Sequence, residues 1–216
     1  MRSGAAFPDP QPYVRLRVGR SAAAQAFQHD WILVHEMVHL AVPRLARTHN
    51  WLHEGLATYV EGVARTQAGI TTPGQFWGEL ARDMPQGQPV DGDRGLDHTP
   101  TWGRTYWGGA MFCLLADVAI RRSTHTRLGL QHALQGVLTA GGNYAVAWTV
   151  KHLLSVADAA VGQPILIDLY GAMKDRPAPA DLPALWQQLG VTRFDGADAN
   201  LLDDAPLAAV RRAITS

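Results

Sequence analysis

The most informative stretch of the sequence is His35-Glu36-Met37-Val38-His39. On a helix, residues four apart lie one turn above each other on the same face, so His35 and His39 can bind one zinc ion as neighbouring ligands. Glu36 then projects beside the metal, where its carboxylate can take a proton from zinc-bound water. Residues 31–40 are apolar nearly all round, which predicts a buried helix. A metal would account for two histidines and a carboxylate on such a helix, because unpaired polar groups are costly to bury.

A third ligand is available in the stretch Trp51-Leu52-His53-Glu54-Gly55-Leu56-Ala57-Thr58-Tyr59, which opens a second predicted helix near residues 51–66. Asn50 is its expected N-cap. Glu54 lies 15 positions after His39, so an antiparallel pair of helices can bring it level with the histidines. Two histidines and one carboxylate leave a fourth position for water, as catalytic zinc sites do.

Other residues near Glu54 leave alternatives open. His49 and His53 are substitutes for the third ligand, although His53 points about 100° away from Glu54 around the helix. Thr58 and Glu61 lie four and seven positions after Glu54, on the same face. Either can orient a ligand histidine through a hydrogen bond, or simply face solvent and stabilise the helix.

The metzincin class is excluded by two positions downstream of His39. That class requires Gly three positions and His six positions after its second histidine. Val42 and Leu45 occupy those positions here.

Composition and length exclude several other classes. A chain of 216 residues is one ordinary domain, and its 19 basic and 19 acidic residues give a formal net charge of zero. Neither a nucleic-acid partner nor a polybasic membrane contact is expected from that balance. The single cysteine, Cys113, excludes a disulfide framework and is expected in the core.

No segment approaches the roughly 20 apolar residues of a membrane span, and no secretory signal opens the sequence. We therefore expect a soluble protein, and removal of a leader from a longer precursor would place it in the periplasm or outside the cell.

The pattern along the chain predicts a mainly α fold, or α+β with minor strand content. Residues 1–12 are expected to form a loose arm, residues 13–18 one strand and residues 83–103 a long loop. We divide the chain into an arm and strand (1–21), a helical catalytic domain (22–195) and a C-terminal tail with a short helix packed on it (196–216). Besides residues 51–66, helices are predicted near 22–42, 104–122, 127–139, 144–157, 164–174 and 181–189, and from Asp204.

Three blocks of the sequence together resemble a known family. The pair His-Glu-x-x-His and Trp-Leu-x-Glu-Gly-x-Ala-x-Tyr looks like the gluzincin metallopeptidases of the MA clan. Tyr106-Trp107-Gly108-Gly109-Ala110, continuing to Asp117 and Ile120-Arg121, resembles the corresponding block of the glycyl aminopeptidase family. The likeness covers roughly residues 28–140, and it implies a zincin-type helical domain in which a second helix carries the glutamate ligand.

The resemblance also implies roles for individual residues. One zinc ion would be held by His35, His39 and Glu54, with Glu36 as the general base. Tyr106 would stabilise the oxyanion that forms when a peptide bond is attacked. The chain carries no Gly-x-x-Glu exopeptidase motif before His35, so an aminopeptidase-like activity and an endopeptidase acting on small peptides both stay open.

These observations lead to three functional hypotheses. The first is a zinc metallopeptidase, a hydrolase that acts on peptide or protein substrates through metal-activated water. The second is a catalytically inactive relative that keeps the fold and binds peptides or a partner. The third is a helical structural domain in which the motif is accidental.

Overall fold

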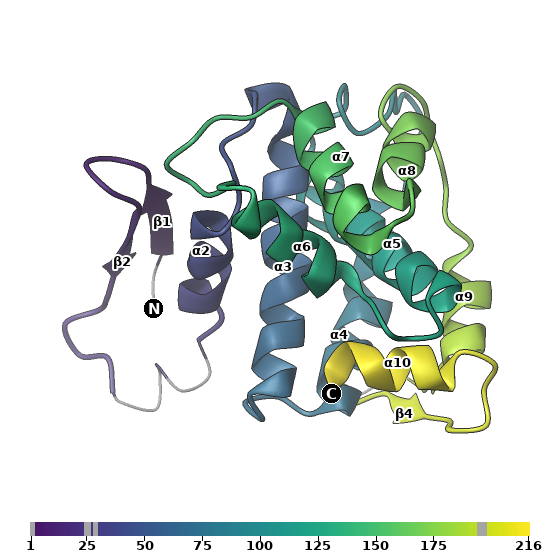
Figure 1. Ribbon diagram of the computed structural model, residues 1–216. Coiled ribbons are helices and arrows are strands. Elements are labelled where there is room, and N and C mark those ends of the chain that lie inside the picture. Colours follow the sequence, from purple (N-terminus) through teal and green to yellow (C-terminus); the bar gives the residue numbers. More distant parts are fainter. Residues whose placement is uncertain (1–2, 24–26, 28–29, 194–197) are drawn as a thin grey trace.

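A computed structural model of the chain describes residues 3–23, 27, 30–193 and 198–216 (Figure 1). Helices dominate these residues, which confirms the mainly α fold class. None of the helices within the described ranges is long and apolar enough to cross a lipid bilayer. The strands are β1 (Ser3–Phe7), β2 (Tyr13–Arg17), β3 (Val191–Thr192) and β4 (Asn200–Leu201). The α-helices are α2 (Ile32–Leu40), α3 (Asn50–Gln67), α4 (Pro73–Asp83), α5 (Gly109–Ser123), α6 (Leu130–Thr139), α7 (Val150–Val161), α8 (Ile165–Met173), α9 (Leu182–Leu189) and α10 (Ala208–Thr215). Two short 3₁₀-helices, η1 (Arg47–His49) and η2 (Met84–Gly87), and one π-helix, η3 (Arg104–Gly108), lie between them.

The N-terminal segment forms a β-hairpin on the outer side of α2, opposite α3 (Figure 1). The strand predicted at residues 13–18 is confirmed as β2, but the loose arm predicted for residues 1–12 is wrong, because β1 pairs antiparallel with β2. The small side chains of β1 give no alternating pattern, so its strand character comes from pairing with β2. They also let it lie close to α2: a Cβ added at Gly4 would overlap the side chains of Ile32 and Glu36.

Helix α2 is shorter than the helix predicted for residues 22–42. The Asp30 carboxylate accepts a hydrogen bond of 2.7 Å from the backbone N–H of Ile32, where the helix begins. Residues 24–26 and 28–29 of the predicted helix lie outside the described residues.

The expected burial of α2 is also wrong. Its only buried residues are His35 and His39, while Met37 is 55% exposed and Leu33 is 39% exposed. Because α2 lies at the edge of the helical body, between the hairpin and α3, part of its apolar surface stays open to solvent (Figure 1).

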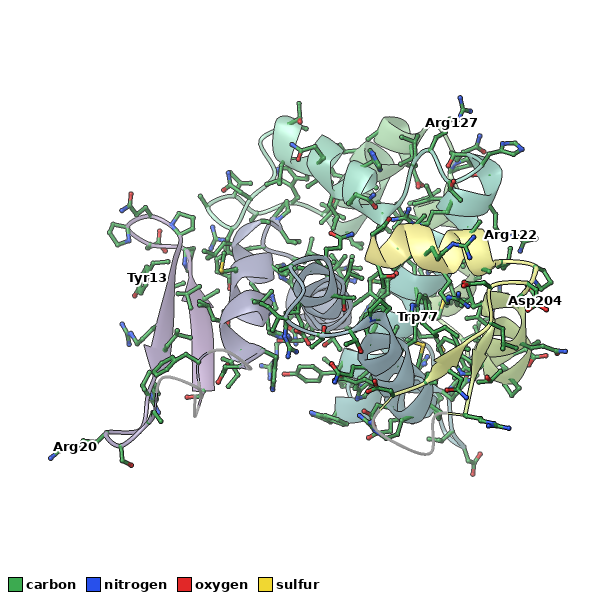
Figure 2. The ribbon with its side chains drawn as sticks, turned by 90° about the horizontal axis from the view of Figure 1, so that it is seen from below. Tyr13, Arg20, Trp77, Arg122, Arg127 and Asp204 are labelled. Atoms are coloured by element: carbon green, nitrogen blue, oxygen red, sulfur yellow. The ribbon has the colours of Figure 1, made fainter. Side chains whose placement is uncertain are left out.

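The long helix α3 packs against both α2 and α5, and the core extends from it into the C-terminal half. The helix predicted near residues 51–66 is confirmed, but Asn50 is its first residue rather than its N-cap. Figure 2 shows Trp77 of α4 inside the helical body, whereas Tyr13 lies on the hairpin at its edge. Cys113 of α5 is buried, as expected.

Helix α4 was not predicted, although its start is well marked. The Thr72 side chain accepts a hydrogen bond from the backbone of Gln75, the Gln75 side chain accepts one from the backbone of Thr72, and Pro73 occupies the first turn. The apolar residues that follow, including Phe76 and Trp77, face the core.

The remaining helices agree with prediction in number and order, with shifted starts. Thr149 caps α7, so this helix begins at residue 150 and not near 144. Helix α6 begins at residue 130, and α10 begins at residue 208 and not at Asp204. The two ends predicted for α9 are confirmed, since Asp181 caps its start and Gly190 follows its end with a φ of 72°.

The predicted long loop is confirmed after η2 and is held by three charged side chains. Arg104 forms an ion pair with Asp93 at 2.7 Å and donates a hydrogen bond to the carbonyl of Gly87. Asp97 accepts hydrogen bonds from Trp51 at 2.8 Å and Tyr170 at 2.7 Å, which ties the loop to α3 and α8. These contacts fix the segment that leads into η3.

Candidate metal centre

The structure brings His35, His39 and Glu54 together, with one ligand atom of each lying within 4.8 Å of the others. Nε2 of His35 lies 3.2 Å from Oε2 of Glu54, and Nε2 of His39 lies 3.6 Å from the same oxygen. Ligand atoms bound at 2.0–2.2 Å to a tetrahedral zinc ion stand roughly 3.3–3.6 Å apart. The two distances to Glu54 lie close to this range, so the group could hold a metal ion of this kind.

Close packing of two helices sets the position of Glu54. A Cβ added at Gly55 would overlap the backbone of Gly109, and a Cβ added at Gly109 would overlap the backbone of Trp51. Only glycine permits α3 and α5 to cross at this distance. The crossing lies next to Glu54 on α3 and three residues after Tyr106, which lies in η3 just before α5, so it brings both side chains to the same cleft.

Electrostatics keep Glu54 ionised. Burial opposes ionisation, but hydrogen bonds with His35 and His39 outweigh it and lower the pKa of Glu54 to about 2. A carboxylate rather than a carboxylic acid therefore faces the two imidazoles at neutral pH. This is the state in which a carboxyl group binds a metal.

The two alternative third ligands have other partners, although His53 lines the same cleft as Glu54. His53 lies 2.7 Å from the carbonyl oxygen of Pro43 through Nε2, and burial lowers its pKa to about 4. Nδ1 of His49 lies 3.1 Å from Oδ1 of Asp97. Neither belongs to the group of ligand atoms formed by Glu54 and the α2 histidines within the part of the chain that the structure describes.

Glu36 and Tyr106 line the same cleft of about 650 Å³ as the three ligand residues. The backbone of β1 passes over Glu36 at Gly4, so the hairpin forms one wall of the cleft. The Tyr106 ring is stacked on that of His35, with centroids 6.3 Å apart. Burial raises the pKa of Tyr106, and the nearby charge of Glu54 adds to the rise, so its phenol stays protonated and can donate a hydrogen bond.

Thr58 and Glu61 line a smaller neighbouring cavity, together with His35. Among the described residues neither hydrogen-bonds a ligand histidine, and Glu61 instead pairs with Arg65 at 3.4 Å. The suggested orienting role of these two residues therefore has no supporting contact.

Sequence reasoning missed Tyr144 as a wall of the cleft. It lies in the link between α6 and α7, where its backbone N–H donates to the carbonyl of Leu40 at the end of α2. Its ring meets that of His53 edge to face, with centroids 6.0 Å apart. The only signal in the sequence was a tyrosine in a Gly-rich turn, which does not reveal a contact with a helix about one hundred residues earlier.

Comparisons with known proteins give no information on this site. No model of a known protein family matches the chain, and no curated protein matches it. The class that the residues themselves define is a helical protein with a His-His-Glu group in an open cleft.

Proposed function

We propose that the protein is a zinc-dependent peptidase that hydrolyses peptide bonds in peptide or protein substrates. The observation that carries the proposal is the approach of both α2 histidines to one oxygen of Glu54, at 3.2 and 3.6 Å, inside a cleft that also holds Glu36 and Tyr106. A structural zinc site would be closed by a fourth protein ligand, whereas a catalytic one keeps three and opens to solvent.

His35, His39 and Glu54 would hold the ion. When bound, zinc would activate a water molecule at neutral pH and polarise the carbonyl of the bond to be cut. Glu36 accepts the proton of the attacking water and delivers it to the leaving amine. The Tyr106 phenol donates a hydrogen bond to the carbonyl oxygen as negative charge develops there.

The experiment compares the wild type with Glu36→Gln, which keeps the size of the side chain and removes its basicity. Asp168→Asn, an exposed carboxylate on α8, is the matched control. Both variants are expected to retain one zinc ion per chain, measured by elemental analysis. Cleavage of a peptide library is expected to fall about 10²–10⁴-fold in Glu36→Gln alone.

A wild type that cleaves no peptide, or cleaves at the rate of Glu36→Gln, would leave the peptide-binding relative as the better account. A wild type that retains no metal would favour the third hypothesis, a helical structural domain in which the motif is accidental.

A further inference from the structure

We call the cleft that contains His35, His39 and Glu54 the metal cleft. A second cavity of about 140 Å³ adjoins it and shares Trp31, His35 and Tyr106 with it. Its volume is well below the roughly 300–1,000 Å³ of pockets that enclose whole small ligands. It therefore suits one side chain or chain end of a larger molecule bound in the metal cleft.

Aromatic rings form most of the wall of this cavity. Trp102 is 60% exposed and Trp31 is 48% exposed, so they mark its open end, whereas Trp107 is 9% exposed and lies deeper. The Trp102 ring is stacked on that of Tyr106, with centroids 5.7 Å apart. Indole faces carry partial negative charge and attract cations more strongly than other aromatic side chains do.

Besides Thr58, two carboxylates line the wall: Glu61 from α3, which is 7% exposed, and Glu79 from α4, which is exposed. Arg65 contacts Oε2 of Glu61 at 3.4 Å, and among the described residues Oε1 of Glu61 has no hydrogen-bond partner. Burial raises the pKa of Glu61 to about 7; Arg65 opposes that rise and Glu79 adds to it. The cavity thus holds a buried carboxyl group whose charge is only partly compensated.

We propose that this cavity binds a cationic group of the substrate, an alkylammonium or guanidinium. The inference rests on the proposed function, since it assigns a substrate group to the space beside the metal cleft. A cation fits both features of the wall, because it pairs with Glu61 and Glu79 and lies against indole faces. An apolar group would bury Glu61 further and supply no charge beyond that of Arg65, and an anion would be repelled by both carboxylates.

The cation can come from a Lys or Arg side chain or from the amino terminus of the substrate. Four peptides of equal length separate these sources: each has either a free or an acetylated amino terminus, and either lysine or norleucine beside the scissile bond. Binding is measured by calorimetry with the zinc-loaded Glu36→Gln chain at pH 8, so that no turnover is needed.

At least one cationic peptide is expected to bind about tenfold more tightly than the acetylated norleucine peptide. The preferred peptide identifies the source of the cation. Adding Glu61→Gln or, separately, Trp102→Ala is expected to reduce the preference to less than about threefold. Asp168→Asn should leave it unchanged, and thermal unfolding checks that each variant is folded.

Equal binding of all four peptides, or a preference that survives in Glu61→Gln and Trp102→Ala, would overturn the inference. These results are distinct from failure of the proposed function. A chain that prefers cationic peptides but never cleaves them keeps the cavity assignment and loses the peptidase. A chain that cleaves neutral peptides as well as cationic ones keeps the peptidase proposal and loses the cavity assignment.

Discussion

Glu54 is the single residue on which the proposed metal site depends most, because one of its oxygens contacts both histidines of α2. Glu54→Ala removes that ligand and is expected to lower zinc content from one ion per chain to a small fraction. The rise in melting temperature on adding zinc should vanish with it, because metal binding is coupled to the folded state. Elemental analysis and thermal unfolding, with and without chelator, measure both effects. A variant with unchanged zinc stoichiometry would contradict the assignment of Glu54 as a ligand.

Tyr106 tests the chemistry apart from the metal. Tyr106→Phe keeps the ring that is stacked on His35 and removes only its hydroxyl group. We expect unchanged zinc content and a fall in kcat of about 10²–10³-fold, by analogy with the loss of one oxyanion-hole donor. Steady-state kinetics provide the measurement. If KM rises while kcat is kept, the phenol contributes to binding rather than to the transition state.

Glu61 gives the protein a specific dependence of stability on pH. Burial raises its pKa from 4.5 to about 7, against the opposing charge of Arg65 and with that of Glu79 adding to it. The native state therefore holds the proton more tightly, and this stabilisation is complete below pH 4.5 and is lost as pH rises to about 7.

Between pH 4.5 and 8, the unfolding free energy of the wild type should fall relative to Glu61→Gln by at most about 3 kcal/mol. Urea denaturation of both proteins across this range measures the difference. A difference that stays constant with pH would show that the pKa of Glu61 is not raised.

Among the contacts between elements, the crossing of α3 and α5 leaves no room for an added side chain. Gly55→Ala introduces a methyl group where the backbone of Gly109 lies, so the helices must separate. We expect a loss of about 1–3 kcal/mol or more, with reduced zinc affinity because Glu54 moves too. Gly171→Ala in α8 is the control, since an added Cβ meets no atom within 4 Å. It should stabilise the protein by about 0.5–1 kcal/mol. Urea denaturation compares the two, and an equal effect would contradict the tight crossing.

Elements with strong local signals could be predicted from the sequence, and those formed by tertiary pairing could not. Helix α9 has both of its caps in the sequence, at Asp181 and Gly190, and its predicted range agrees with the structure. Strand β1 has small side chains from Ser3 to Ala6, which carry no strand signal, and it owes its conformation to pairing with β2. Helix α2 shows a further limit, because an apolar sequence such as that around Met37 does not reveal which face the neighbouring elements leave uncovered.

For the molecule as a whole, the site is predicted best where local spacing determines geometry. The separation of His35 and His39 by one helical turn follows from the helix alone. The approach of Glu54 follows from two helices joined by a short link. Trp102 and Glu79 come together only because the long loop and α4 fold back onto α3, and nothing in their own sequence context predicts that contact.

Asp97 connects distant parts of the chain, and its loss should destabilise the fold. Its carboxylate accepts hydrogen bonds from Trp51 and Tyr170 and contacts His49 at 3.1 Å, joining the long loop to α3 and α8. Asp97→Asn keeps the volume of the side chain but removes its charge. The new amide NH₂ is a donor, so it cannot accept the hydrogen bonds that Trp51 and Tyr170 donate. A loss of about 3 kcal/mol in unfolding free energy is expected, since hydrogen bonds to charged groups contribute about 1.5–3 kcal/mol each.

The matched control for Asp97→Asn is Asp175→Asn, which removes a surface contact between His98 and a side chain that is 54% exposed. This change should cost less than about 1 kcal/mol. Urea denaturation compares the two variants, and hydrogen exchange locates the effect. Because the loop leads into η3, which carries Tyr106, Asp97→Asn should also raise amide exchange around residues 96–108 and at the start of α3. Exchange that increases in the loop alone would show that Asp97 holds the loop without supporting α3.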